Sequence, residues 1–388
     1  RDRLRSRGLG DVYKRQAADH LGLNPSVPAT CFPTSSATAC SWDEKLGEAV
    51  GEALGEEAAA QEVAVLLGPG LNIQRSPLCG RDFEYFSEDP ILAGRMAAAY
   101  VRGIQKNGIS ACPKHFAVNS QELRRMASDS VLDERTLREL YLTGFEIVVK
   151  EAKPKTIMTS YNLINGTYAN ENAHLLQDIL RKDWGFDGAV VTDWGGSNDH
   201  ALGVKNGSTL EMPCPGGDSI RELMKAVKDG KVTEADLDAR LDELLELVLS
   251  THAAVEKAPR TFDAAAHHAL ARRAAAESIV LLKNEDGILP LKAGEKLAVI
   301  GDFAETPRYQ GAGSSAVNAL QVDTLLDSIK ADDSGITFVG YASGFERQGA
   351  ADAEKLEEAV ALAKKADTVL LCLGLDELRE SEGLDRSD

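Results

Sequence analysis

Residues 188–194 read Gly-Ala-Val-Val-Thr-Asp-Trp, an apolar run that ends in a carboxylate and a large aromatic residue. A short apolar run of this kind predicts a buried strand, with Asp193 at its end. A carboxylate held there can attack a carbon centre, and the ring of Trp194 can stack on the apolar face of a sugar. The pair suits a glycosidase, although Asp193 could equally cap the helix that follows.

Polar groups follow other predicted strands in the same way. Apolar runs at 63–67, 110–115, 156–161, 189–193 and 208–212 alternate with amphipathic segments, which is typical of βα units around a parallel sheet. Four of these runs end in polar groups: Lys114-His115, Tyr161-Asn162, Asp193-Trp194 and Glu211-Met212. One polar strand end usually caps a helix or bonds within a loop. Four in succession favour an α/β fold of the (β/α)8 TIM-barrel type, in which these positions meet at the mouth.

Two helices are well marked in this region. Ser41-Trp-Asp-Glu44 matches a capping box and predicts a helix to about Gln61. A second helix begins after Thr233. Its expected buried face consists of residues at helical spacing, namely Leu237, Leu241, Leu244, Leu245 and Val248.

The chain divides into four segments. Residues 1–16 are basic and patternless, as expected of a non-native leader, and residues 17–250 carry the barrel pattern. Residues 251–263 are rich in Ala, Lys, Pro and Arg and predict a linker. Residues 264–388 form a second α/β unit, with helices expected at 264–276 and 351–366 and strands at 297–300, 336–339 and 368–373. We expect this second unit to be truncated, because its last strand runs almost to the end of the chain.

Composition limits the classes of partner and compartment. The 388 residues include 61 acidic and 43 basic side chains, and the formal charge of −18 disfavours nucleic acids and anionic membranes as partners. No apolar run reaches the roughly 20 residues of a membrane span, and no secretory signal is visible. The six cysteines are scattered without metal-type spacing, so we expect reduced thiols in a cytoplasmic protein, with a disulfide as the alternative.

Several cationic residues allow more than one reading. Lys114 and His115 could hydrogen-bond the hydroxyls of a neutral polyol, or Lys114 could form a Schiff base as in aldolases. Arg81 and Arg125 could clamp a substrate or form surface ion pairs. The glycines at 68–70 and 311–313 do not match a dinucleotide fingerprint.

Ordered motifs along residues 17–388 resemble those of the family 3 glycoside hydrolases, in the multidomain β-glucosidase branch. The resemblance rests on VPATCFP (27–33), GRDFEYFSEDP (80–90), KHFAVN (114–119), MTSYNLING (158–166), WGFDG (184–188), VTDW (191–194), EMP (211–213), SIVLLKN (278–284) and ESEGLDR (380–386). It implies a (β/α)8 TIM-type barrel, followed by an α/β sandwich domain whose loop reaches over the barrel mouth.

The resemblance also implies a retaining exo-acting β-glycosidase, specifically a β-glucosidase that acts by double displacement. Asp193 matches the family's nucleophile. Glu380 is our choice for the acid/base, because it fills the first glutamate of the family's Glu-x-Glu-Gly-x-Asp-Arg loop, and Glu382 is its rival. Substrate-binding roles fall on Arg81, Lys114, His115, Arg125, Tyr161, Trp194 and Glu211. No metal or cofactor is implied. The expected partner is a small β-glycoside or oligosaccharide, and a homo-oligomer is one of the states left open.

The chain departs from the family at its start. The early Asp-Gly-Pro-x-Gly segment, whose aspartate grips sugar hydroxyls, is missing where residues 1–15 stand, and Asp11 does not match it. We therefore expect a barrel without its first strand and a chain truncated at both ends. The alternatives are a β-xylosidase or another family 3 exo-glycosidase, a Schiff-base aldolase using Lys114, and a non-catalytic sugar-binding fragment.

Overall fold

Short parallel strands lie side by side in the order expected for a barrel. The computed structural model describes residues 27–214 and 216–387, so the expected leader at 1–16 and Asp11 lie outside the described residues. β2 (Val65–Leu66) pairs with β3 (Ser110–Ala111), and β5 (Thr156–Met158) pairs with β8 (Ala189–Val191). Parallel bridges join Phe116 to Thr159 and Val191 to Leu210. The five expected runs thus form one parallel series, although each regular strand is shorter than its apolar run.

Alternation along these strands separates two apolar cores. One set of side chains packs among the strands themselves and includes Val65, Leu67, Cys112, Met158 and Val191. The alternate set packs beneath the surrounding helices and includes Leu66, Ala111, Ile157 and Val190. Both faces of the sheet are therefore buried, as a parallel sheet requires.

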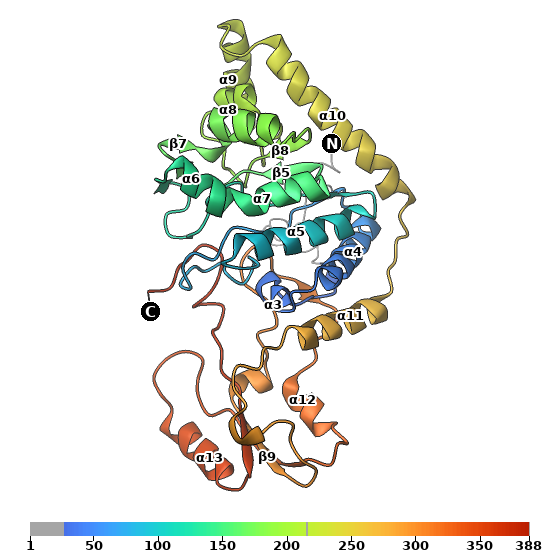
Figure 1. The fold of residues 1–388 in the computed structure, drawn as a ribbon, viewed down its shortest axis with the longest axis vertical. Coiled ribbons are helices and arrows are strands. Elements are labelled where there is room, and N and C mark those ends of the chain that lie inside the picture. Colours follow the sequence, from blue (N-terminus) through green and yellow to red (C-terminus); the bar gives the residue numbers. More distant parts are fainter. Residues whose placement is uncertain (1–26, 215, 388) are drawn as a thin grey trace.

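Helices cover the outer face of the strands (Figure 1). In the barrel they are α3 (Ser35–Ala39), α4 (Glu44–Ala60), α5 (Pro90–Gln105), α6 (Glu134–Thr136), η1 (Leu137–Leu142), α7 (Thr143–Ile147), η2 (Val148–Ala152), η3 (Ala169–Glu171), η4 (His174–Asp183), α8 (His200–Asn206), α9 (Gly217–Lys228) and α10 (Glu234–Lys257). α4 and α5 approach so closely that a Cβ on Gly51 would overlap the backbone of Tyr100. Three short strands, β4 (Asp129–Ser130), β6 (Leu163–Ile164) and β7 (Thr167–Tyr168), form a separate small sheet.

The predicted start of α4 was wrong in its cap. The hydroxyl of Ser41 donates to the carbonyl of Thr38 at 2.7 Å, which closes α3. Asp43 caps α4 instead, because its carboxylate accepts from the amide of Lys45 at 2.8 Å. The capping-box pattern found the helix but misplaced its first residue by two positions.

α10 also differs from its prediction. A capping box forms between Thr233 and Asp236, as the helix signal suggests, but Leu241 and Leu245 are about half exposed. The fully buried positions are Leu247, Thr251 and Val255, while Leu237, Leu244 and Val248 of the predicted face are partly buried. The helix continues to Lys257, so the first seven residues of the expected linker at 251–263 are helical.

The second unit contains a three-stranded parallel sheet in the order β11 (Thr337–Ala342), β9 (Lys296–Ile300), β12 (Thr368–Leu371). Its other elements are α11 (Ala264–Glu277), η5 (Glu285–Gly287), η6 (Asp302–Ala304), β10 (Asn318–Ala319), α12 (Leu325–Lys330) and α13 (Ala353–Ala363). α11 packs against α4, and β10 pairs in parallel with β1 (Pro28–Ala29). After β12 the chain returns to the barrel, where its end lies beside the barrel loops (Figure 1). The fold is a TIM-type barrel followed by an α/β sandwich domain.

Within the described residues, no helix combines the length and apolar character needed to cross a membrane.

Candidate active site

Asp193 lies just beyond β8 and faces His115. Its Oδ2 is 3.5 Å from His115 Nε2, and its Oδ1 accepts from the amide of Trp194 at 2.7 Å. The next helix, α8, is capped by Asp199, whose carboxylate accepts from Leu202 at 2.8 Å. Asp193 is therefore not the cap of that helix, and its carboxylate lies at the barrel rim, where Oδ2 faces His115.

Lys114 and Arg81 share one carboxylate. Lys114 Nζ is 2.9 Å from Glu84 Oε1, and Arg81 Nη2 is 2.8 Å from Glu84 Oε2. Both cations are almost completely buried. A lysine paired in this way keeps its ammonium charge, whereas a Schiff base needs the neutral amine, so this contact disfavours the aldolase alternative.

Glu382 enters this cluster from the sandwich domain. Its Oε1 is 3.0 Å from Arg125 Nη1 and 3.7 Å from Arg81 Nη1. Arg125 also pairs with Glu122 at 2.8 Å, and its guanidinium carbon lies 4.9 Å from the ring centre of Tyr161. Alternating charges thus run from the barrel strands to the sandwich loop.

Tyr161 connects the two carboxylates of interest. Its hydroxyl donates to the carbonyl of Trp194 at 2.9 Å, directly beside Asp193. Burial raises the pKa of Tyr161 well above its usual range, and the charges of Asp193 and Glu382 add to that rise while Arg125 opposes it. The charges of Asp193 in the barrel and Glu382 in the sandwich domain therefore both influence the ionisation of Tyr161.

The electrostatic surroundings of Glu382 favour its ionised form. Burial alone would favour the neutral acid, but Arg81 and hydrogen bonds from Ser314 outweigh it and hold the pKa of Glu382 well below its usual range. The amide of Ser314 donates to Glu382 Oε2 at 2.7 Å. Glu382 is therefore held as a carboxylate.

Glu380, by contrast, turns away from this cluster. Its Oε2 pairs with Arg308 Nη1 at 2.9 Å, and its backbone carbonyl accepts from Arg308 Nη2 at 2.7 Å. It lines an interdomain cavity of about 620 Å³ together with Asp82. Burial raises the pKa of Asp82 to about 7, with further contributions from the charges of Glu380 and Asp385. The two glutamates of the 380–386 motif thus face different spaces.

Asp385 fastens the Glu382 segment to the barrel. Its carboxylate accepts three backbone N–H groups, from Gly80 at 3.1 Å, Glu122 at 2.9 Å and Leu123 at 2.8 Å. The fit at Gly80 is tight, since a Cβ there would overlap the carbonyl oxygen of Leu384. The sandwich loop is therefore held by hydrogen bonds that barrel loops donate.

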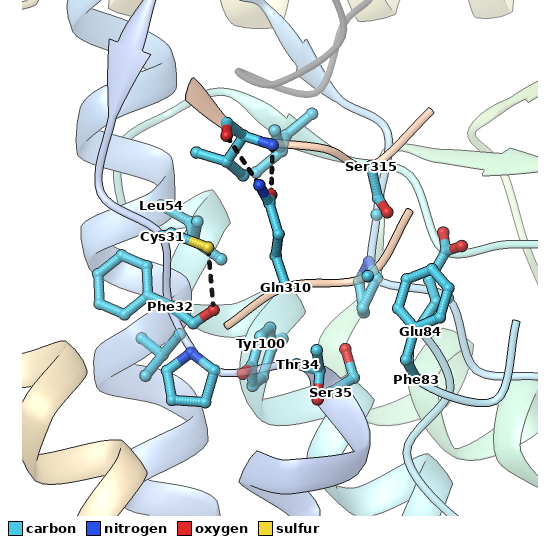
Figure 2. A pocket seen from close by; sticks show the side chains of 18 of the residues that line it. Cys31, Phe32, Thr34, Ser35, Leu54, Phe83, Glu84, Tyr100, Gln310 and Ser315 are labelled. Atoms are coloured by element: carbon cyan, nitrogen blue, oxygen red, sulfur yellow. Dashed lines mark hydrogen bonds between the residues drawn. The ribbon is translucent and has the colours of Figure 1, made fainter. Parts of the chain in front are cut away.

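A second, smaller cavity of about 140 Å³ lies beside the Glu84–Lys114 pair (Figure 2). Its lining is mostly apolar and comes from α4, α5 and the sandwich segment 310–317. The side chain of Gln310 accepts from Val317 N at 2.6 Å and donates to Val317 O at 3.1 Å, as the dashed lines in Figure 2 show. These two hydrogen bonds close the loop 310–317, which contains Ser314, the residue whose amide donates to Glu382.

The structure brings most of the predicted binding residues together, with one exception. The cluster around Asp193 and Glu382 contains five of them, namely Arg81, Lys114, His115, Arg125 and Tyr161. Trp194 follows Asp193 directly and is 44% exposed. Glu211 instead faces α8 and α9, where it contacts His200 at 3.5 Å and Ser219 at 3.1 Å.

Sequence reasoning missed several members of the cluster. Glu84 and Tyr85 lie inside the quoted 80–90 motif, and Asp385 lies inside the 380–386 motif, yet only Arg81, Glu380 and Glu382 were singled out there. Glu122 carried no signal beyond its position three residues before Arg125. Their roles depend on contacts between segments far apart in the chain.

Among residues 27–214 and 216–387, no group of three or more His, Cys, Asp or Glu side chains is arranged to hold a metal ion.

Comparison with known proteins places both units of the chain. The model of the glycosyl hydrolase family 3 N terminal domain matches residues 20–247, and that of the family 3 C-terminal domain matches residues 279–388. Thermostable beta-glucosidase B of Acetivibrio thermocellus is 46% identical over 377 residues, which is 96% of this chain and 50% of that protein. An exo-alpha-(1->6)-L-arabinopyranosidase of Bifidobacterium longum is 47% identical over 380 residues, 95% of this chain and 50% of that protein.

The solved structures similar to this chain include beta-glucosidases as well. The GH3 beta-glucosidase of Bifidobacterium adolescentis superposes with a TM-score of 0.89 at 42% identity, covering 100% of this chain and 58% of that one. Beta-glucosidase 3B of Thermotoga neapolitana in complex with glucose gives a TM-score of 0.83 at 34% identity, covering 94% and 54%. The chain spans about half the length of the curated relatives it matches.

Proposed function

The chain belongs to glycosyl hydrolase family 3, and we propose that it acts as a retaining exo-β-glycosidase that releases terminal β-D-glucosyl residues. The observation that carries the proposal is the meeting of two carboxylates from different domains at one site. Glu382 pairs with Arg125, whose guanidinium lies over the ring of Tyr161. The hydroxyl of Tyr161 donates to the carbonyl of Trp194, directly beside Asp193. Carboxylate pairs of this kind are the machinery of glycoside hydrolysis.

In the first step Asp193 is the nucleophile. Its ionised Oδ2 attacks the anomeric carbon, the bond from that carbon to the leaving oxygen breaks, and Glu382 gives its proton to that oxygen. Asp193 thereby becomes covalently bound to the sugar and Glu382 becomes a carboxylate. In the second step Glu382 takes a proton from water, the water oxygen attacks the same carbon, and Asp193 is released.

We assign the acid/base role to Glu382 and not to Glu380. Glu380 is paired with Arg308 at the separate cavity, whereas Glu382 faces the Asp193 cluster. The ionised form of Glu382 suits the second step directly. For the first step, sugar hydroxyls must draw donors of Arg81 and Arg125 away from Glu382, so that burial, the largest influence on its pKa, can favour the protonated acid.

The identity of the sugar rests on the relatives. Proteins similar to this chain are named beta-glucosidases, and one solved structure is titled as a complex with glucose. An exo-alpha-(1->6)-L-arabinopyranosidase is similar to the same degree, which makes α-L-arabinopyranosides the second candidate substrates. Both are pyranosides, and one double displacement serves both. A β-xylosidase is the less supported alternative.

The test of this proposal uses the purified protein and 4-nitrophenyl glycosides. We expect hydrolysis of the β-D-glucoside, with Asp193→Ala reducing kcat by several orders of magnitude. Asp199→Ala is the matched control, because it removes a nearby carboxylate that caps α8 and should lose stability but not activity. No hydrolysis of any aryl glycoside by the folded wild type would refute the proposal.

A panel of leaving-group-matched substrates then decides the sugar. The expected order of kcat/KM is β-D-glucoside above α-L-arabinopyranoside, with β-D-xyloside lowest. A higher value for the arabinopyranoside would transfer the assignment to the second candidate and leave the mechanism in place.

A further inference from the structure

We propose that Tyr85 is a positioning residue whose phenol fixes the tautomer of His115, so that Nε2 carries the proton that faces Asp193. The kinetic consequence of this inference rests on the proposed function, but the tautomer itself does not.

A continuous row of buried polar groups supports it. The hydroxyl of Tyr85 is 3.2 Å from His115 Nδ1, and His115 Nε2 is 3.5 Å from Asp193 Oδ2. Asn119 Nδ2 donates to the same hydroxyl at 3.3 Å. Tyr85, His115 and Asn119 are each at most 2% exposed. Buried polar groups are usually satisfied by hydrogen bonds within the protein. Asp193 Oδ2 is buried without a hydrogen-bond partner among the described residues, and His115 Nε2 faces it.

The donor directions in this row follow from Asn119. An amide nitrogen can only donate, so the phenol oxygen of Tyr85 accepts from Asn119 and its own proton is available for His115 Nδ1. Burial raises the pKa of Tyr85 well above its usual range, against the opposing charge of Arg81, so the phenol keeps that proton. With Nδ1 accepting, the proton of a neutral imidazole resides on Nε2.

The charge of Asp193 gives an independent reason for the same tautomer. If the amide of Asn119 were turned over, Tyr85 would donate to it and His115 Nδ1–H would donate to Tyr85. The lone pair of Nε2 would then face the carboxylate of Asp193 at 3.5 Å, which is repulsive. The first arrangement places an N–H there instead. Both arguments therefore put the proton on Nε2.

Charged groups lie close to Tyr85 and His115. The guanidinium of Arg81 lies 6.0 Å from the centre of the Tyr85 ring, and Glu84 adjoins Tyr85 in sequence. Asp193 faces His115 from the other side. With Nδ1 accepting a hydrogen bond from the Tyr85 phenol, the neutral imidazole presents its Nε2–H to Asp193.

The expected effect on the reaction is on the nucleophile. A neutral Nε2–H can orient the carboxylate of Asp193. Because the neutral imidazole does not transfer its proton to Asp193, the carboxylate stays ionised and can attack the sugar. Tyr85→Phe removes the phenol proton and keeps the ring. His115 then loses the partner that fixes Nδ1 as an acceptor.

The direct test is the tautomeric state of His115, read from long-range proton–nitrogen correlation spectra of protein labelled with ¹⁵N-histidine. The chain has seven histidines, and the spectrum of His115→Asn identifies the signals of His115 by their loss. We expect wild-type His115 to be the Nε2–H tautomer at neutral pH, and Tyr85→Phe to show a changed protonation pattern. Tyr100→Phe is the control, because Tyr100 is also buried but its hydroxyl faces Thr38.

Kinetics provides the second readout. Loss of one fixed hydrogen bond predicts a fall of about tenfold in kcat for Tyr85→Phe with KM close to wild type, and no such fall for Tyr100→Phe. An Nδ1–H tautomer in the wild type would overturn the inference even if Tyr85→Phe did not fold. An unchanged His115 pattern in folded Tyr85→Phe would overturn it as well. Absence of glycosidase activity in the wild type would refute the proposed function but leave the tautomer measurement standing.

Discussion

Asp385→Asn tests how the Glu382 segment is seated on the barrel. The substitution keeps size and shape but removes the charge that accepts N–H groups from Gly80, Glu122 and Leu123. The amide can still present one oxygen to Glu122 and Leu123. Its nitrogen must then face the N–H of Gly80, where two donors oppose each other.

The size of the effect follows from these contacts. A backbone donor left without a partner costs about 1–3 kcal/mol, and each remaining bond loses about 0.5–1 kcal/mol when its acceptor becomes neutral. The segment that carries Glu382 is therefore loosened by about 2–5 kcal/mol. Since about 1.4 kcal/mol is a factor of ten, we expect kcat/KM to fall by about 30-fold or more.

The assay is steady-state hydrolysis of 4-nitrophenyl β-D-glucoside, with unfolding in urea measured in parallel. Asp352→Asn is the matched control, because Asp352 caps α13 by accepting from Lys355 at 3.1 Å and lies outside the docking contact. It should lose about 1 kcal/mol of stability at most and keep kcat/KM. A kcat/KM within about threefold of wild type for folded Asp385→Asn would refute the idea that this carboxylate seats Glu382.

Three further predictions concern single groups. The pKa of Asp82 is raised from its usual 3.8 to about 7 by burial and by Glu380, so the folded state holds a proton that the unfolded state releases. The free energy of unfolding should therefore fall as pH rises from about 4 to 7. Measured in urea, the free energy of unfolding of Asp82→Asn should rise relative to that of wild type across this window, and the difference between the two should be constant at higher pH. The pKa of His267 is raised above 6.5, first by its hydrogen bond with Glu57, so its contribution to stability is complete below pH 6.5 and declines at higher pH. The difference between wild type and His267→Gln in urea should shrink accordingly, and a difference that grew with pH would contradict the pairing. Glu382→Ala should reduce kcat/KM by about 10²–10⁴-fold on an alkyl β-glucoside and far less on the dinitrophenyl glucoside, whose leaving group needs no proton; equal losses on the two would argue against an acid role.

The sequence predicted the fold well because apolar runs and polar strand ends are local signals. Strands at 65–66, 110–111, 156–158 and 189–191 lie inside the predicted runs and pair in parallel. Local signals failed where two groups compete for one role. Ser41 was expected to cap α4, but its hydroxyl is already engaged by α3 and Asp43 takes the position.

The site was predictable where a residue type has few other uses. The position of Asp193, after a buried strand and before Trp194, marked it as a candidate, and the family resemblance gave it the nucleophile's role. Glu84, Tyr85 and Asp385 were not, because their importance comes from partners 30 or more residues away, such as His115 and Gly80. The choice between Glu380 and Glu382 likewise depends on Arg308 and Arg125, which compete for neighbouring carboxylates in ways that spacing does not reveal.

Glu382 of the sandwich domain is expected to act together with Asp193 of the barrel. Azide rescue on the dinitrophenyl glucoside distinguishes Glu382 from Glu380, because a small anion can replace a missing acid/base in the second step and is then transferred to the sugar. We predict that azide restores turnover of Glu382→Ala and yields β-glucosyl azide, while Glu380→Ala shows no rescue. Rescue of Glu380→Ala with none for Glu382→Ala would contradict the account.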